Sequence, residues 1–154
     1  DVERSRGLGD VYKRQEEDAK NFEKRADVMV AFFDSIEVAP GVHANGRMTL
    51  GENIADHGGL QVSYQAFKKA TASAPLEVKD GFTPEQRFFL AYANVWANNT
   101  RPEAILQLTK IDVHSLGKWR VDAALPHIAA WYDAFGITEK DPMYVPVEER
   151  ISIW

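Results

Sequence analysis

The chain has 154 residues, enough for one domain with a sizeable core, and its 45% hydrophobic and 27% charged residues are ordinary for a globular protein. The net charge of −5 gives no basic surface, so the sequence argues against nucleic acid as a partner. No apolar run approaches the roughly 20 residues that span a bilayer, so no membrane span is expected. The absence of cysteine rules out disulfides and thiolate metal ligands.

The N-terminal part of the chain divides into a segment without periodicity and a helix. Residues 1–15 show neither a helical nor a strand period, and we expect them to form a disordered or artefactual segment outside the domain. From Glu16, apolar residues recur at three- and four-residue spacing, which predicts an amphipathic helix ending near Asp34. The turn dipeptides Pro40-Gly41 and Asn45-Gly46 then predict a loop with at most a short pair of strands.

The strongest chemical signal lies in residues 49–60, which read TLGENIADHGGL. Thr49, followed three residues later by Glu52, has the spacing of a capping box and predicts a helix that starts at Leu50. Glu52 and Asp56 are then one turn apart and share a face. Because the two like charges repel each other, we expect an arginine, a helix N-terminus or a metal ion opposite them.

Three small residues lie on the same predicted helix as these carboxylates, and the sequence predicts further helices after it. Ala55, Gly58 and Gly59 would let a second helix approach closely. Residues 83–86 read TPEQ and predict a well-capped helix with an aromatic stripe that is typical of a core. Prolines at 102 and 126 open shorter helices, and Gly136 has the position of a C-terminal cap. The fold class predicted is mainly α, with almost no sheet.

Two stretches carry a family resemblance. Residues 45–60 have the pattern N-G-x-x-T-L-G-E-N-I-A-D-x-G-G-L, and residues 112–120 read DVHSLGKWR. They resemble the signature segments of the neprilysin and endothelin-converting enzyme family of zinc metallopeptidases, which includes bacterial oligopeptidases, although leucine replaces the usual proline at position 116. The resemblance implies that residues 16–154 are the helical C-terminal part of a thermolysin-like (zincin) catalytic domain.

The resemblance also implies a role for each polar residue of these stretches. Glu52 would be the third ligand of one catalytic zinc ion, and Asp56 would support a zinc-binding histidine. His114 would stabilise the oxyanion of the tetrahedral intermediate with the support of Asp112, and Arg120 would bind the substrate backbone.

The aromatic stripe ends at Val95 and Trp96, which are further candidates for contacts with a peptide substrate. The histidines are at positions 43, 57, 114 and 127, and no two of them are four residues apart, so the H-E-x-x-H helix that supplies the other zinc ligands in the family is missing. His57 lies off the face that carries the two carboxylates and is not favoured as a substitute ligand. His43 is interpreted as a loop residue and His127 as a structural or exposed one.

Two functional readings stay open from the sequence. The first is a segment of a zinc endopeptidase that cleaves oligopeptides, inactive by itself and dependent on the missing N-terminal part of the same polypeptide. The absence of cysteine departs from the disulfide-linked animal members and suits a bacterial one, in the periplasm or cell envelope. The second is a metal-free helical interaction module without catalysis.

Overall fold

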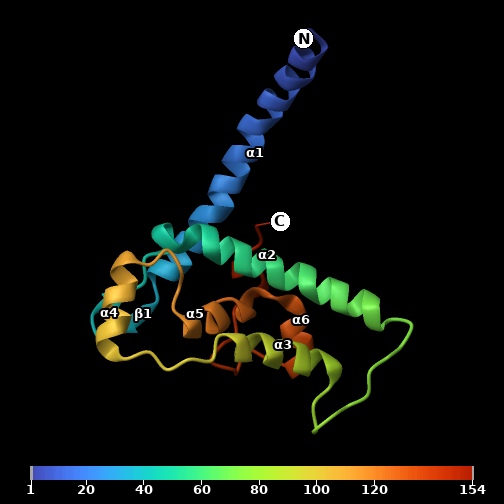
Figure 1. The fold of residues 1–154 in the computed structure, drawn as a ribbon, viewed down its shortest axis with the longest axis vertical. Coiled ribbons are helices and arrows are strands. Elements are labelled where there is room, and N and C mark those ends of the chain that lie inside the picture. Colours follow the sequence, from blue (N-terminus) through green and yellow to red (C-terminus); the bar gives the residue numbers. More distant parts are fainter. Residues whose placement is uncertain (1, 154) are drawn as a thin grey trace.

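The computed structural model describes residues 2–153 and, among side chains, those of residues 16–153. Figure 1 shows a mainly helical chain, as the sequence predicts. The elements in order are α1 (Val2–Asp34), β1 (Glu37–Ala39), β2 (Val42–His43), α2 (Gly46–Thr71), α3 (Pro84–Val95), α4 (Pro102–Ile111), α5 (Gly117–Asp122), η1 (Leu125–His127), α6 (Ala129–Phe135) and η2 (Val147–Glu149). None of the helices in this described part combines the length and the apolarity that crossing a membrane requires.

The helix α1 is longer than predicted. Its backbone is helical from Val2, whereas the sequence shows no helical period before Glu16. Each residue added to an existing helix gains a hydrogen bond, and the Glu, Arg, Lys and Gln residues of this stretch are good helix formers even without an apolar period. The described side chains before Ala26 are all exposed, and this part of α1 projects away from the rest of the molecule (Figure 1).

The start of α2 also differs from the prediction. Asn45 is the N-cap, and its side-chain oxygen accepts a hydrogen bond from the backbone N–H of Met48 at 2.9 Å. Thr49 lies inside the helix, where its hydroxyl donates to the carbonyl oxygen of Asn45. The capping-box interpretation of Thr49 and Glu52 is therefore wrong, because Asn45 already caps the helix four residues earlier. The side chain of Glu52 is not needed at the helix start.

The remaining caps and the strand pair follow the sequence more closely. Thr83 and Gln86 form the predicted capping box at the start of α3, and Gly136 ends α6 in a left-handed conformation. The strands β1 and β2 form one short antiparallel pair. The last helix does not begin at Leu125, because that stretch forms the short 3₁₀ helix η1, and α6 starts at Ala129.

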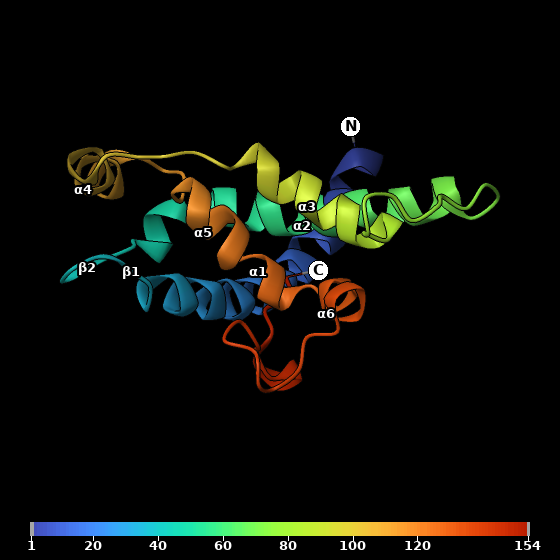
Figure 2. The ribbon, with the colours of Figure 1, turned by 90° about the horizontal axis from the view of Figure 1, so that it is seen from below.

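Two hydrophobic clusters hold the helices together. The first joins α2 to α3, η1 and α6, which Figure 2 shows grouped in the same part of the molecule. Its buried members are Leu60, Phe89, Leu125, Ile128, Trp131 and Tyr132. The second joins the end of α1 to the region of α5 and the C-terminal segment, through Met29, Phe33, Ala123, Ile151 and Ile153. Leu50 and Ile54, in the first half of α2, pack against this second cluster.

Gly46 lies where α1 packs closely on α2, so a larger residue at this position should destabilise the fold. A Cβ atom at the buried Gly46 would overlap the backbone carbonyl of Val30, which cannot move away without shifting α1. We therefore expect Gly46→Ala to lower the free energy of unfolding by about 1–3 kcal/mol, as overpacking does elsewhere. Urea unfolding monitored by circular dichroism measures the change.

The matched control is Gly51→Ala in the same helix. A Cβ atom at Gly51 meets nothing within 4 Å, so this variant should be up to about 1 kcal/mol more stable through its higher helix propensity. Equal stability changes in the two variants would contradict the close contact between α1 and α2.

Candidate functional site

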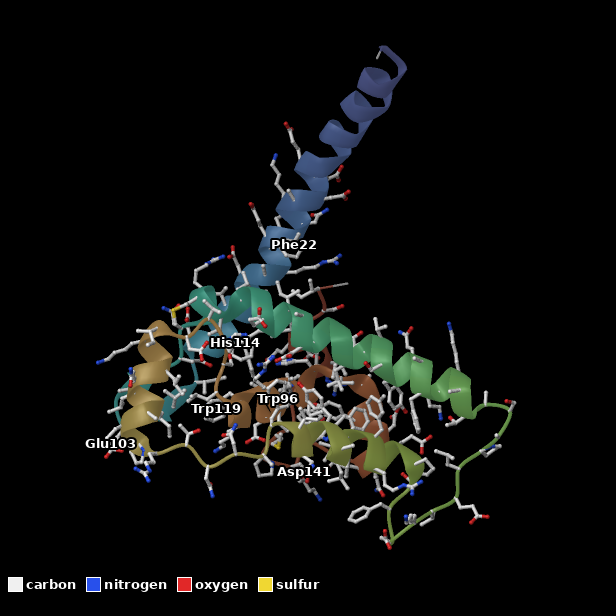
Figure 3. The ribbon with its side chains drawn as sticks, in the orientation of Figure 1. Phe22, Trp96, Glu103, His114, Trp119 and Asp141 are labelled. Atoms are coloured by element: carbon white, nitrogen blue, oxygen red, sulfur yellow. The ribbon has the colours of Figure 1, made fainter. Side chains whose placement is uncertain are left out.

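The loop between α4 and α5 places His114 opposite Glu52 of α2. The Nε2 atom of His114 lies 3.4 Å from a carboxylate oxygen of Glu52, and the two side chains are 45% and 42% exposed. Figure 3 shows His114 beside the first half of α2. The two groups therefore share an open edge of the molecule, where a ligand has access to both of them.

Asp112 orients the imidazole of His114. Its Oδ1 atom lies 2.8 Å from Nδ1 of His114 and accepts the backbone N–H of the same residue at 2.9 Å. The backbone hydrogen bond first, and the imidazole second, lower the pKa of the Asp112 carboxyl below its ordinary value. A carboxylate accepts only from a protonated nitrogen, so Nδ1 carries a proton and Nε2 is the atom that faces Glu52.

Behind this edge, Asp56 and Arg120 form an ion pair that is mostly buried. The Nε and Nη2 atoms of Arg120 donate to the two carboxylate oxygens of Asp56 at 2.6 and 2.7 Å. The side chains are only 12% and 14% exposed, and the hydrogen bonds to Asp56 raise the pKa of Arg120 above its ordinary value. From the sequence, an arginine, a helix N-terminus or a metal ion is expected opposite the carboxylates. In the structure, the partner of Asp56 is an arginine, Arg120.

Tyr92 of α3 and Trp96, the residue that caps its end, contact Arg120. Its guanidinium lies 3.7 Å from the ring centroid of Trp96, and its carbonyl oxygen accepts the hydroxyl of Tyr92 at 2.8 Å. Burial, and secondly the charge of Asp56, raise the pKa of Tyr92 to about 12, so this hydroxyl stays a donor. Trp96 thus contacts Arg120, whereas its neighbour Val95 is 70% exposed at the end of α3.

A hydrogen-bonded chain beneath the loop was not singled out from the sequence. Ser115 donates to the side-chain oxygen of Asn53 at 2.7 Å, and the amide of Asn53 donates to the hydroxyl of Thr49 at 2.9 Å. Asn53 is 4% exposed. Asparagine has a low helix propensity, so its presence inside α2 is the one local sequence signal that Asn53 has a role other than helix formation.

Of the remaining histidines, His57 and His127 are buried and His43 is exposed. His57 is 2% exposed, and its ring lies 6.5 Å from that of His127, whose Nδ1 accepts the backbone N–H of Ile151 at 3.1 Å. Burial lowers the pKa of both, that of His127 to about 4, so both stay neutral near pH 7. His43 lies at the surface with Nδ1 3.1 Å from the carbonyl oxygen of Asp34.

The described residues do not form a complete metal site by themselves. Among residues 16–153 no group of three His, Cys, Asp or Glu side chains is close enough to hold a metal ion. Catalytic zinc sites use three protein ligands, and Glu52, free of the helix cap and half exposed, fits one of them.

The outer face of α2 is open and apolar. It forms a groove of about 450 Å³ lined by Ile54, Ala55, Gly58, Gly59, Gln61, Val62 and Gln65. Ala55 and Gly59 are exposed, and a Cβ atom at Gly59 would meet nothing within 4 Å. The close helix packing that the sequence predicts for these small residues is thus not made by the described part of this chain.

Comparison with known proteins identifies the class. A solved Mycobacterium tuberculosis zinc metalloprotease in complex with an inhibitor has a similar fold, with a TM-score of 0.83 and 27% sequence identity over 88% of this chain and 22% of that chain. The fold is therefore that of the helical part of a zinc metalloprotease. The model of Peptidase family M13 matches residues 7–151, and the chain belongs to this family.

Two relatives indicate how much of such a protein the chain represents. Human Membrane metallo-endopeptidase-like 1 is 36% identical over 140 residues, which are 88% of this chain and 18% of that protein. Human Neprilysin is 34% identical over 144 residues, 90% of this chain and 19% of that protein. The neprilysin resemblance is confirmed, and the chain spans about a fifth of these relatives. The family match begins at residue 7, before the domain boundary predicted at Glu16.

The arrangement of Asp112 predicts how its pKa responds to mutation. In His114→Ala, the pKa of Asp112 should rise only part of the way to the ordinary value, because the backbone N–H of residue 114 remains and is the larger cause of the shift. A carbon-13 NMR titration of the carboxyl group measures this. His43→Ala is the control and should leave Asp112 unchanged. A complete return to the ordinary value would contradict the dominant backbone hydrogen bond.

Proposed function

We propose that this chain supplies the C-terminal side of a zinc endopeptidase active site, with Glu52 as one zinc ligand. The observation that carries the proposal is the convergence of Glu52 and His114 at an open edge, in a chain that belongs to Peptidase family M13. Zinc accepts carboxylate oxygen as a ligand, and when bound it supplies Lewis-acid activation of the peptide carbonyl and of water.

His114 would act on the carbonyl oxygen of the scissile peptide bond. Asp112 holds Nδ1 as a donor to the carboxylate, so Nε2 is directed toward the open edge. A proton on Nε2 would donate a hydrogen bond to that oxygen as negative charge develops on it, which is the charge-stabilising function of an oxyanion site. Because Nδ1 already carries a proton, a proton on Nε2 makes the ring an imidazolium, whose positive charge the carboxylate of Asp112 would stabilise.

Arg120 would bind the backbone of the peptide. Its two hydrogen bonds to Asp56 use two of the five N–H donors of a guanidinium, and the others are available to a backbone carbonyl. The ring of Trp96 fixes the guanidinium plane from one side. Asp56 retains acceptor capacity for a zinc-binding histidine from elsewhere, since a carboxylate accepts about four hydrogen bonds.

Val95 is retained as a candidate substrate contact because it is exposed beside Trp96.

The proposal requires zinc ligands and a general base from another part of the polypeptide. It is supported by the length of the relatives, of which this chain spans about a fifth, and by the lack of a group of three metal ligands among the described residues. Inactivity of the chain by itself, and a location in the bacterial cell envelope, stay predictions.

The second candidate is a metal-free helical interaction module. The observation that favours it is the open apolar groove on α2, which offers a binding face without any chemistry. Metal binding distinguishes the two candidates, because a module that acts through this groove has no use for the Glu52 carboxylate.

The test is Glu52→Gln in the complete polypeptide that contains this chain. Glutamine is neutral and binds zinc less well than a carboxylate does, so we expect zinc affinity to fall by at least about 100-fold. This loss is larger than the one expected when a residue that only hydrogen-bonds to a zinc ligand is removed. Peptide hydrolysis should fall together with zinc affinity. Mass spectrometry of bound zinc and a fluorogenic peptide assay measure both.

Glu103→Gln on the exposed surface of α4 is the control and should change neither zinc content nor activity. Full zinc occupancy and activity in Glu52→Gln would refute the ligand role and leave the interaction module as the better account.

A further inference from the structure

We infer that Asn53 and Ser115 are positioning residues that fasten the His114 loop to α2 and so set the separation of His114 and Glu52. The inference rests on the proposed function. Its basis is that each of the two residues directly follows one of the groups that meet at the open edge. One hydrogen bond between them, across 62 positions of sequence, therefore links the segments that carry both groups.

The hydrogen bonds beneath the loop have a defined direction. The hydroxyl of Ser115 donates to Oδ1 of Asn53, and Nδ2 of Asn53 donates to the hydroxyl of Thr49. The hydroxyl of Thr49 in turn donates to the carbonyl oxygen of Asn45 at 3.0 Å. Each group is the donor to the next, so the amide of Asn53 has one favourable orientation, and its oxygen points to the loop.

Burial makes this connection stronger than the direct contact at the edge. Asn53 and Thr49 are 4% and 5% exposed and the bond from Ser115 to Asn53 is partly buried, whereas His114 and Glu52 are about half exposed. Exposed ion pairs contribute little because water screens them, while hydrogen bonds in a buried network are electrostatically stronger and costly to break. The contact of His114 with Glu52 therefore cannot hold the loop by itself.

Other contacts hold the two ends of the loop between α4 and α5, and Ser115 holds its middle. At one end, the backbone N–H of Asp112 donates to the carbonyl oxygen of Leu108 in α4. At the other end, Gly117 packs tightly against the carbonyl of Trp96, and Arg120 is bound to Asp56. Between these ends, the bond from Ser115 to Asn53 connects the loop to α2, and its loss would let His114 move relative to Glu52.

The experiment uses Ser115→Ala in the complete polypeptide. Because a misplacement of about 1 Å can lower a rate by two orders of magnitude, we expect kcat for peptide hydrolysis to fall about 10- to 100-fold, with zinc content and KM within about twofold of the parent. Ser115→Thr keeps the hydroxyl and should restore kcat to within about threefold. Ser63→Ala, at an exposed position of α2, is the matched control.

A Ser115→Ala enzyme with the kcat of the parent would overturn the inference. So would a Ser115→Thr enzyme as slow as Ser115→Ala, because the hydroxyl would then not be the group responsible. An enzyme that loses its zinc in Ser115→Ala would also overturn it, since the residue would then act on the metal and not on His114.

A second measurement keeps the inference testable if the complete polypeptide has no peptidase activity. Hydrogen exchange of the His114 amide, which donates to Asp112, reports how firmly the loop is held. In this 154-residue chain, we expect Ser115→Ala to accelerate that exchange at least tenfold and Ser63→Ala to leave it unchanged. Unchanged exchange in Ser115→Ala would refute the positioning role, whereas missing hydrolysis in the parent would refute only the proposed function.

Discussion

The carboxylate of Asp56 and the guanidinium of Arg120 are mostly buried, and each makes the burial of the other tolerable. Removing charges from water is costly, and only a well-aligned partner with several hydrogen bonds offsets that cost. The two hydrogen bonds of this pair connect α2 to α5 across 64 positions of sequence. The loop that carries His114 leads directly into α5, so this pair anchors the C-terminal end of the loop. Loss of either partner would leave a buried charge unpaired.

Local sequence rules predicted the helices and the shared face of two site residues. The spacing of Glu52 and Asp56 places both on one side of a helix wherever that helix begins, so an error in the starting residue left this conclusion intact. The capping box of α3 and the glycine at the end of α6 follow from equally local geometry. The start of α2 was missed because Asn45-Gly46 has the composition of a turn, and a turn and an N-cap use the same residue types.

The pairs that assemble the site could not be predicted from spacing. Arg120 with Asp56, and Ser115 with Asn53, are joined by the packing of whole helices, and no local period encodes them. The family resemblance placed Glu52, Asp56, His114 and Arg120 in one site, and the structure brings these four side chains together as two contacting pairs. Asn53 was overlooked because a polar residue in a helix is usually solvated, and only the tertiary structure shows that this one is buried.

The proposed site requires that Glu52 faces a zinc ion whose other ligands come from the same polypeptide. Anomalous X-ray diffraction at the zinc absorption edge, on crystals of the complete polypeptide, tests it most directly. We expect a zinc peak about 2.0–2.2 Å from a carboxylate oxygen of Glu52, on the side of α2 that faces His114. A zinc peak more than about 3 Å from both oxygens of Glu52 would contradict it, because that separation is too long for a zinc–oxygen bond.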